Sequence, residues 1–302
     1  MLARLQRLIT LTLIAVACGW GLYFRVHAPQ FAIVGFFAIV LGYTGFLAVE
    51  FMLLSVINRS DPSPRATAGE LFSAWLGESL VAPRIFCWRQ PFRANEVPDS
   101  LSPPNAVYGR RGVVFIHGFF CNRGFWTPWL KRLRGTGNAF VAVTLEPVFA
   151  SIDDYAPQIE AAVVRVTQAT GMAPLLVCHS MGGLAARAWL RAMQSEARVH
   201  HVVTIGTPHR GTWLARFGRG SNGRQMRLLS DWQEQLDHGM PAGRHALFTC
   251  WYSNTDNIVF PASTATLPGA DNRLVRGAAH VQMAFLPQVI ADTLARLNAT
   301  SD

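Results

Sequence analysis

Hydrophobic residues are concentrated in two long runs at the start of the chain and in shorter, spaced runs after residue 110. No residue is charged from Leu8 to Phe24 or from Phe31 to Val49. Each run has roughly the 17–20 residues that a helix needs to cross a bilayer core. Because only "RVHAPQ" separates them, we predict a transmembrane helical hairpin over residues 1–57. "FMLLSVI" either extends the second span to residue 57 or lies along the membrane interface.

A cleaved signal peptide is the alternative interpretation of the first run. Arg4 and Arg7 would then form its basic n-region. "AVAC", which ends at Cys18, resembles a lipoprotein cleavage site. The second long run follows almost at once, which favours the hairpin.

The arginines around the two runs suggest an orientation. Arg4 and Arg7 precede the hairpin, Arg59 and Arg65 follow it, and the connector carries only Arg25. Positive charge favours the cytoplasmic side of a membrane. We therefore predict an inner-membrane protein with two spans and its main domain in the cytoplasm.

Charge and cysteine content agree with a cytoplasmic domain beside a membrane. The formal net charge is +9 and the isoelectric point about 10.0, but no nucleic-acid-binding module is recognisable. Scattered arginines fit attraction to anionic lipid headgroups better. The five cysteines are odd in number and dispersed, and they form neither a disulfide framework nor a metal-ligand spacing.

Beyond the hairpin, residues 58–110 are interpreted as a linker and N-terminal extension, and residues 111–302 as one domain. The extension could pack on that domain or on the membrane. From Gly112, apolar strands alternate with helices, which predicts an α/β fold with a mostly parallel sheet covered on both faces. The expected strands are "GVVFIHGF", "AFVAVTLEP", "PLLVCHS", "HVVTIGTP", "HALFTCWYS" and "NRLVRG". Ser151, with Asp154 three residues on, predicts a capping box at the start of one helix.

Active sites in such sheets lie beyond the carboxyl ends of the strands, and Ser180 stands at one such end. In "LLVCHSMGGLAARAWL" the serine is flanked by Cys178, Gly182 and Gly183, which resembles the G-x-S-x-G turn. A nucleophile elbow needs small residues there because the chain turns sharply from strand into helix. Cysteine replaces the first glycine, which is a modest increase in bulk. An ordinary buried turn is the alternative.

His117 and Gly118 follow an early strand, in the position of half an oxyanion hole. The donors there are backbone N–H groups, so the tight turn matters more than the side chains. We expect the pair to be the N–H groups of Phe119 and Met181, the latter at the positive end of a helix. The His117 side chain is expected to be architectural.

An orienting acid and a base are also needed. Asp256 comes directly after a strong strand, in "CWYSNTDNIVFP", whereas Asp271 in "PGADNR" is a fallback with turn character. The other acids that follow Ser180 are weaker candidates: Glu196, Asp231, Glu234 and Asp237. His280 ends "NRLVRGAAH" and leads into the final helix, whereas His209 is expected to pack a loop.

Five segments together, "VFIHGF", "CHSMGG", "TIGTPHRGT", "TDNIV" and "GAAH", resemble the α/β-hydrolase superfamily, especially bacterial triacylglycerol-lipase-like serine esterases. The resemblance covers roughly residues 111–298 and not the hairpin. It implies a catalytic triad of Ser180, Asp256 and His280 that works without a metal or organic cofactor.

The expected activity is hydrolysis of lipid or other acyl esters through an acyl-enzyme. An acyltransferase with the same triad and a non-catalytic scaffold are the alternatives. Residues 212–244, between two strands, are expected to form a cap over the acyl pocket, with surface decoration as the alternative. Expected partners are the acyl-ester substrate and membrane lipids, with neither nucleic acid nor an obligate protein partner.

Overall fold

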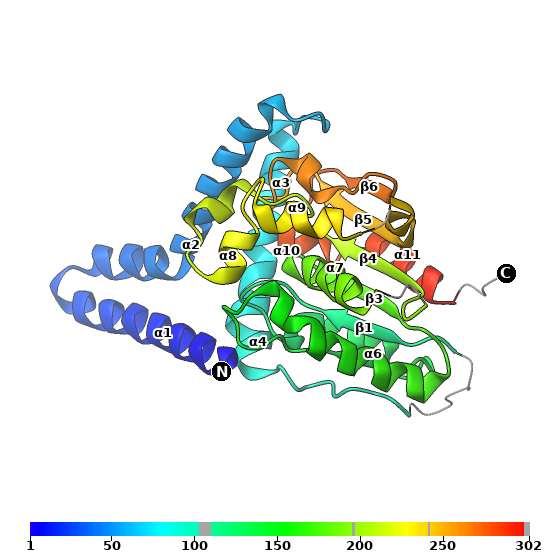
Figure 1. Ribbon diagram of the computed structural model, residues 1–302. Coiled ribbons are helices and arrows are strands. Elements are labelled where there is room, and N and C mark those ends of the chain that lie inside the picture. Colours follow the sequence, from blue (N-terminus) through cyan, green and yellow to red (C-terminus); the bar gives the residue numbers. More distant parts are fainter. Residues whose placement is uncertain (103–109, 195–196, 241, 299–302) are drawn as a thin grey trace.

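The computed structural model describes residues 1–102, 110–194, 197–240 and 242–298. Within them, six strands form one parallel sheet in the order β2-β1-β3-β4-β5-β6 (Figure 1). The strands are β1 (Val113–Ile116), β2 (Phe140–Ala142), β3 (Leu175–His179), β4 (His201–Ile205), β5 (Phe248–Ser253) and β6 (Asp271–Val275). The predicted α/β fold is confirmed, although β2 is much shorter than its apolar run.

The strand order creates a switch point between β1 and β3. From β1 the chain moves outward to β2, then returns past β1 to β3 and continues toward the opposite edge. Crossovers on either side of this point leave a crevice at the carboxyl ends of β1 and β3. Ser180 follows the end of β3 directly, and Gly118 is the second residue after the end of β1.

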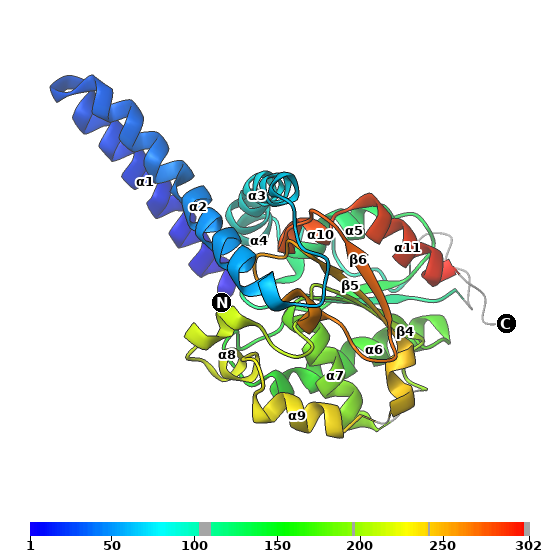
Figure 2. The same ribbon diagram turned by 90° about the horizontal axis from the view of Figure 1, so that it is seen from above.

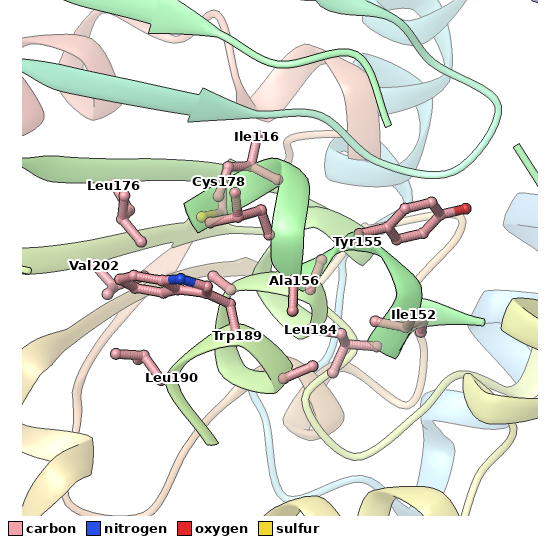
Figure 3. Close-up of a cluster of buried hydrophobic side chains, with 14 of the residues drawn as sticks. Ile116, Ile152, Tyr155, Ala156, Leu176, Cys178, Leu184, Trp189, Leu190 and Val202 are labelled. Carbon is pink, nitrogen blue, oxygen red and sulfur yellow. The ribbon is translucent and has the colours of Figure 1, made fainter. Parts of the chain in front are cut away.

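Helices cover both faces of the sheet (Figure 2). On one face lie α6 (Ala156–Thr170) and α7 (Met181–Met193), and on the other lie α5 (Thr127–Leu133), α10 (His280–Met283) and α11 (Pro287–Asn298). Alternate strand residues serve the two cores, as the pleat requires. Leu176 and Cys178 face α6 and α7 together with Trp189, in the cluster of Figure 3. Leu175 and Val177 belong to the other core.

The first of these helices begins as the sequence predicts. The Ser151 side chain and the Asp154 side chain form the expected capping box. A 3₁₀ turn over Ile152–Tyr155 follows and leads into α6.

The two N-terminal runs form long helices, α1 (Leu2–His27) and α2 (Pro29–Ile57), packed as a hairpin that projects from the sheet (Figures 1 and 2). The turn is shorter than the predicted connector, because Pro29 starts α2 directly after Ala28. Both helices are long and apolar enough to cross a membrane. Exposed apolar side chains occur along both: Leu8, Leu11, Ile14, Leu22, Phe31, Val34, Phe37 and Phe46.

The segment interpreted as linker and extension contains a third long helix, α3 (Ala68–Pro83). A capping box of Thr67 and Glu70 starts it, and a π-helical turn over Arg84–Arg89 leads into α4 (Gln90–Phe92). Of the two alternatives for this segment, α3 packs on the main domain, against α10.

Between β4 and β5 lie short helices that occupy the predicted insertion. They include a 3₁₀ turn over Trp213–Phe217, α8 (Ser221–Gln225), α9 (Asp231–His238) and a 3₁₀ segment over Ala242–Leu247. Figure 2 shows α8 and α9 on the side of the molecule that holds α7.

Candidate active site

Ser180 occupies the sharp turn between β3 and α7. Its backbone has φ 54° and ψ −130°, a positive φ that non-glycine residues rarely adopt. Such strain persists only where the surrounding structure enforces it, and it is concentrated at functional sites. The residue is 8% exposed and lines a cavity. The strand–turn–helix context that a nucleophile elbow requires is therefore present.

Small residues surround this turn for steric reasons. A Cβ at Gly118 would lie 2.7 Å from Ser180 Cβ, and one at Gly182 would lie 2.7 Å from the carbonyl oxygen of His117. Thr207 packs against Gly183 and donates a hydrogen bond from Oγ1 to the Ser180 carbonyl oxygen, at 2.8 Å. The elbow is thus fixed by close backbone approach on one side and by a hydroxyl on the other.

Cys178 fits beneath the turn without crowding it. Its side chain is fully buried in the cluster of Figure 3, among residues of β1 and α7. Burial raises the pKa of its thiol. The thiol therefore stays protonated and serves as a small apolar group, so the departure from glycine is accommodated.

His280 and Asp256 form a buried pair at the same edge of the sheet. The His280 Nδ1 lies 2.9 Å from Asp256 Oδ2. Asp256 follows β5, and its other oxygen, Oδ1, accepts hydrogen bonds from the N–H groups of Ile258 (3.0 Å) and Val259 (2.8 Å). His280 is the first residue of α10. The aspartate is thus fixed by its own loop while it holds the imidazole.

Gly206, directly after β4, makes room for this pair. Its φ is +59°, and a Cβ there would lie 2.9 Å from Asp256 Oδ2 and 3.1 Å from His280 Nδ1. Gly206 is not among the site residues predicted from the sequence, although a glycine directly after the strand in "TIGTP" is a signal for such a position.

The charge state of His280 depends on several buried carboxylates. Burial alone would lower its pKa, but the carboxylates of Asp256, Glu78 and Glu50 outweigh burial and raise it. The imidazolium form is therefore stabilised relative to a free histidine. A base that must become positively charged during proton transfer benefits from this arrangement.

The neighbouring histidines, His117 and His179, make contacts that stabilise the fold around the site. His179 stacks on Phe125 and lies with Nε2 3.2 Å from the His280 carbonyl oxygen. His117 accepts a hydrogen bond at Nε2 from the Leu145 N–H, at 3.0 Å. Burial lowers the pKa of His117 to about 4 and that of His179 well below its usual value. Both rings are therefore neutral packing elements.

Phe119 and Met181 lie at the two loops that meet beside Ser180. Phe119 follows Gly118 after β1 and lines the cavity that Ser180 also lines. Met181 is the first residue of α7, where backbone N–H groups are left without helical partners. The close approach of Gly118 to Ser180 brings these two loops together.

Comparison with known sequences identifies the family. Residues 113–299, more than half of the chain, match the alpha/beta hydrolase family. The chain belongs to the alpha/beta hydrolase family. No curated protein matches the sequence significantly.

Solved structures with the same fold include two lipases and a phospholipase. The mature form of lipase BlEst2 from Bacillus licheniformis has a TM-score of 0.57 and 16% identity, and the match covers 65% of this chain and 96% of that one. Lipase B from Aspergillus fumigatus has a TM-score of 0.51 and 14% identity, and the match covers 80% of this chain and 83% of that one. Phospholipase PlaB from Legionella pneumophila has a TM-score of 0.50 and 16% identity, and the match covers 64% of this chain and 60% of that one. At these identities the likeness establishes a shared fold.

In this alpha/beta hydrolase, the other candidate acids lie elsewhere or outside the described residues. Asp271 lies in β6 and forms ion pairs with Arg273 (2.9 Å) and Arg296 (2.7 Å). Asp237, on α9, pairs with the buried Arg187. Glu196 lies outside the described residues. Asp256 is the acid that the structure brings to His280.

A cavity of about 320 Å³ opens beside Ser180 in the hydrolase. Most of its lining is apolar, and much of it comes from the segment between β4 and β5. Its apolar lining residues are Phe119, Phe149, Pro208, Leu214, Ala215, Met226, Ile258 and Val259. Among the described residues of this hydrolase, no group of three or more His, Cys, Asp or Glu side chains could hold a metal ion. The cavity suits an apolar ligand group.

Proposed function

We propose that this alpha/beta hydrolase is a membrane-attached serine hydrolase that cleaves carboxylic esters of lipids or other acyl compounds. The observation that carries the proposal is the buried His280–Asp256 pair, with Nδ1 and Oδ2 2.9 Å apart, at the sheet edge where Ser180 forms a strained turn. A nucleophile, a base and an orienting acid at one edge of the sheet are the requirements of acyl transfer through a covalent intermediate.

In the proposed mechanism, the His280 Nδ1–H group donates a hydrogen bond to Asp256, which stays ionised, and Nε2 is left free to remove the proton of Ser180. The Ser180 oxygen attacks the ester carbonyl, and the N–H groups of Phe119 and Met181 stabilise the tetrahedral oxyanion. When the intermediate collapses, the alcohol leaves with the proton from His280. His280 then removes a proton from water, which attacks the acyl-enzyme. The second tetrahedral intermediate breaks its bond to the Ser180 oxygen, which takes the proton back from His280 as the acid is released.

The cavity supports an apolar acyl group as the substrate feature that is recognised. Its walls are mainly aliphatic and aromatic, and residues from Thr212 to Met226 contribute a large share of them. In the proposal, residues 212–244 act as a cap that shapes the acyl pocket. The lipase names of BlEst2 and the Aspergillus protein agree with this substrate class.

Attachment to the inner membrane is the second element of the proposal. The length and apolar composition of α1 and α2 support two spans. The arginines at the outer ends of the hairpin support a cytoplasmic catalytic domain. Alkaline phosphatase fused after Arg65 should therefore be inactive, and green fluorescent protein at the same point should fluoresce. An active phosphatase fusion would reverse the orientation.

The catalytic proposal is tested by hydrolysis of p-nitrophenyl esters of short and long acyl chains by the detergent-solubilised full chain. Ser180→Ala should lower kcat by at least about 10³-fold, because no other group supplies the nucleophile. Ser60→Ala, at an exposed position just after α2, is the matched control and should retain activity. Equal turnover by Ser180→Ala would remove the serine from the mechanism.

A fluorophosphonate probe supplies an independent readout of the same proposal. It should label Ser180 in the wild type and leave Ser180→Ala unlabelled, whereas a folded but unlabelled wild type would favour a scaffold. Product analysis with a competing alcohol separates hydrolysis from acyl transfer, since a transferase would form the new ester in preference to the free acid.

A further inference from the structure

The second helix of the hairpin reaches the loop that carries the catalytic acid. Glu50, near the end of α2, is 7% exposed, and its Oε2 accepts a hydrogen bond from Asn257 Nδ2 at 2.7 Å. Asn257 follows Asp256 in the chain. Its Oδ1 accepts a hydrogen bond from the backbone N–H of His280, at 3.2 Å. One asparagine therefore links the hairpin to the residue that we assign as the base.

The end of α2 is also packed against this region. Phe51 and Leu54 of α2 and Ala74 of α3 form a buried cluster with Phe260 and Ala279. Ala279 directly precedes His280. A close-packed cluster at this point restricts movement of the His280 backbone.

Helix α3 contacts the same turn from another direction. Glu78 is 2% exposed, and its Oε1 and Oε2 accept hydrogen bonds from the N–H groups of Val281 (3.1 Å) and Gln282 (3.0 Å). The first N–H groups of a helix lack helical partners. The residue before α10 is Ala279, which has no polar side chain, so a carboxylate about 200 residues away in sequence satisfies these donors.

In the part of the chain that the structure describes, neither carboxylate is balanced by a basic residue. Among the described residues, no arginine or lysine forms an ion pair with Glu50 or Glu78. A buried charge without a partner is costly. The group that can supply a positive charge here is His280, whose pKa both carboxylates raise. The two glutamates are therefore coupled to the charge state of this imidazole.

We propose that Glu50 and Glu78 are positioning residues for His280, so that the helices α2 and α3 form part of the catalytic centre. The inference rests on the proposed function, in which His280 removes the proton of Ser180. Glu78 and Asn257 fix the backbone at His280, and Glu50 fixes Asn257. The carboxylates also stabilise the imidazolium that forms when the proton moves from Ser180 Oγ to His280 Nε2.

The pH dependence of activity separates this role from a purely structural one. The titratable groups that face His280 are Asp256 from the loop after β5, Glu50 from α2, Glu78 from α3 and His179 from β3. Burial raises the pKa of Glu78 to about 7. The low-pH side of the kcat/KM profile, its acid limb, therefore reports the titration of this coupled cluster as a whole.

The sign of the expected shift follows from the charges. His280 must be neutral to act as base, so kcat/KM rises as pH increases through its raised pKa. A variant without a neighbouring carboxylate binds that proton less tightly, and its acid limb should move to lower pH.

The test uses the detergent-solubilised full chain with Glu78→Gln and Glu50→Gln. Glutamine keeps the size of each side chain. At position 50 it can still accept from Asn257, whereas at position 78 it satisfies only one of two N–H groups. Glu78→Gln should lower kcat by about 10- to 100-fold with little change in KM, because small displacements of a catalytic group are costly. Glu50→Gln should have the smaller effect, and both should shift the acid limb to lower pH.

Glu160→Gln is the matched control. This carboxylate lies on α6, on the opposite face of the sheet, where it accepts a hydrogen bond from Trp189 Nε1 at 2.9 Å and forms an ion pair with Arg198. It should leave kcat and the pH profile unchanged. Thermal unfolding of each variant identifies any loss that is due to misfolding, and Glu50→Gln, which retains its hydrogen bond, keeps the test decisive if Glu78→Gln does not fold.

Three results distinguish failure of this inference from failure of the proposed function. If Ser180→Ala abolishes activity but both glutamine variants match the wild type in kcat and in acid limb, the positioning role is wrong and the triad stands. A loss of kcat by the same factor at every pH would also overturn it, because it would indicate a structural contribution alone. If Ser180→Ala is fully active, the proposed function itself fails.

Discussion

The two halves of the candidate site are held in place by different means. Ser180 sits in a turn fixed by β3, α7 and the close approach of Gly118 and Thr207, all within the hydrolase fold. His280 is fixed by polar contacts that converge from the loop after β5 and from two N-terminal helices, through Asn257 and Glu78. The first half is a steric construction, and the second is a buried polar network.

This difference predicts different kinds of failure. A close-packed turn is disrupted by added volume, because its neighbours are backbone atoms that cannot move aside. A buried polar network is disrupted when one donor, acceptor or charge is lost, because its partners then remain buried and unsatisfied. Substitutions of similar size should therefore damage the two halves through different measurable quantities.

The largest expected effect is a substitution in the polar half that leaves the shape unchanged. Asp256→Asn can keep its carbonyl oxygen toward the Ile258 and Val259 N–H groups and present its amide to His280 Nδ1. The amide would donate a hydrogen bond to Nδ1, so the neutral imidazole would carry its proton on Nε2. A protonated Nε2 cannot accept the proton of Ser180. We expect kcat to fall by about 10³- to 10⁴-fold.

The measurement is ester hydrolysis together with thermal unfolding. The fold should persist, because the volume at position 256 hardly changes. A loss of less than about tenfold would mean that Asp256 does not orient the base, since tautomer control is the main role of such an acid.

The steric half is tested by Gly182→Ala. The added Cβ would overlap the carbonyl oxygen of Ile116 and lie 2.7 Å from that of His117, so α7 must move away from the end of β1. This displacement separates the N–H of Met181 from that of Phe119. We expect a destabilisation of about 1–3 kcal/mol, typical of overpacking, and a loss of kcat of about 10- to 100-fold from misplaced donors.

Gly69→Ala in α3 is the matched control for this change. A Cβ there would lie 4.0 Å from Thr67 Oγ1, which is an ordinary contact, so activity should be retained. Chemical denaturation and kcat are measured for both variants. Unchanged stability and kcat in Gly182→Ala would contradict the steric account of the elbow.

The steric half could be predicted from the sequence because its determinants are local. The strand pattern, the turn and the helix all lie within Leu175–Met193, and small residues mark the turn directly. The alternation of strands and helices likewise predicts the sheet. Strand lengths were less predictable, since the apolar run around β2 continues after its ladder ends at Ala142.

The contacts that hold the polar half in place could not be predicted from the sequence in the same way. Glu50 follows an apolar run, where a charged residue indicates the end of a span, and Glu78 lies in a segment of mixed helical spacing. Hydrogen bonds across about 200 residues leave no periodic signal in the sequence. Only the fold brings these carboxylates to the His280 turn, so the sequence alone does not predict their contacts.

The smallest expected effect concerns the acid that the sequence left open as a fallback. Asp271 is exposed in β6 and pairs with Arg273 and Arg296 rather than with a histidine. Exposed ion pairs contribute about 0–1 kcal/mol, so Asp271→Asn should lower the free energy of unfolding by no more than that. Its kcat should stay within about twofold of the wild type, because substitutions remote from a site are normally neutral for it. Parallel assays of Asp271→Asn and Asp256→Asn compare one and the same chemical change at an exposed strand and at a buried pair. A large loss of kcat at position 271 would transfer the orienting role away from Asp256, and the contrast between the two halves of the site would no longer hold.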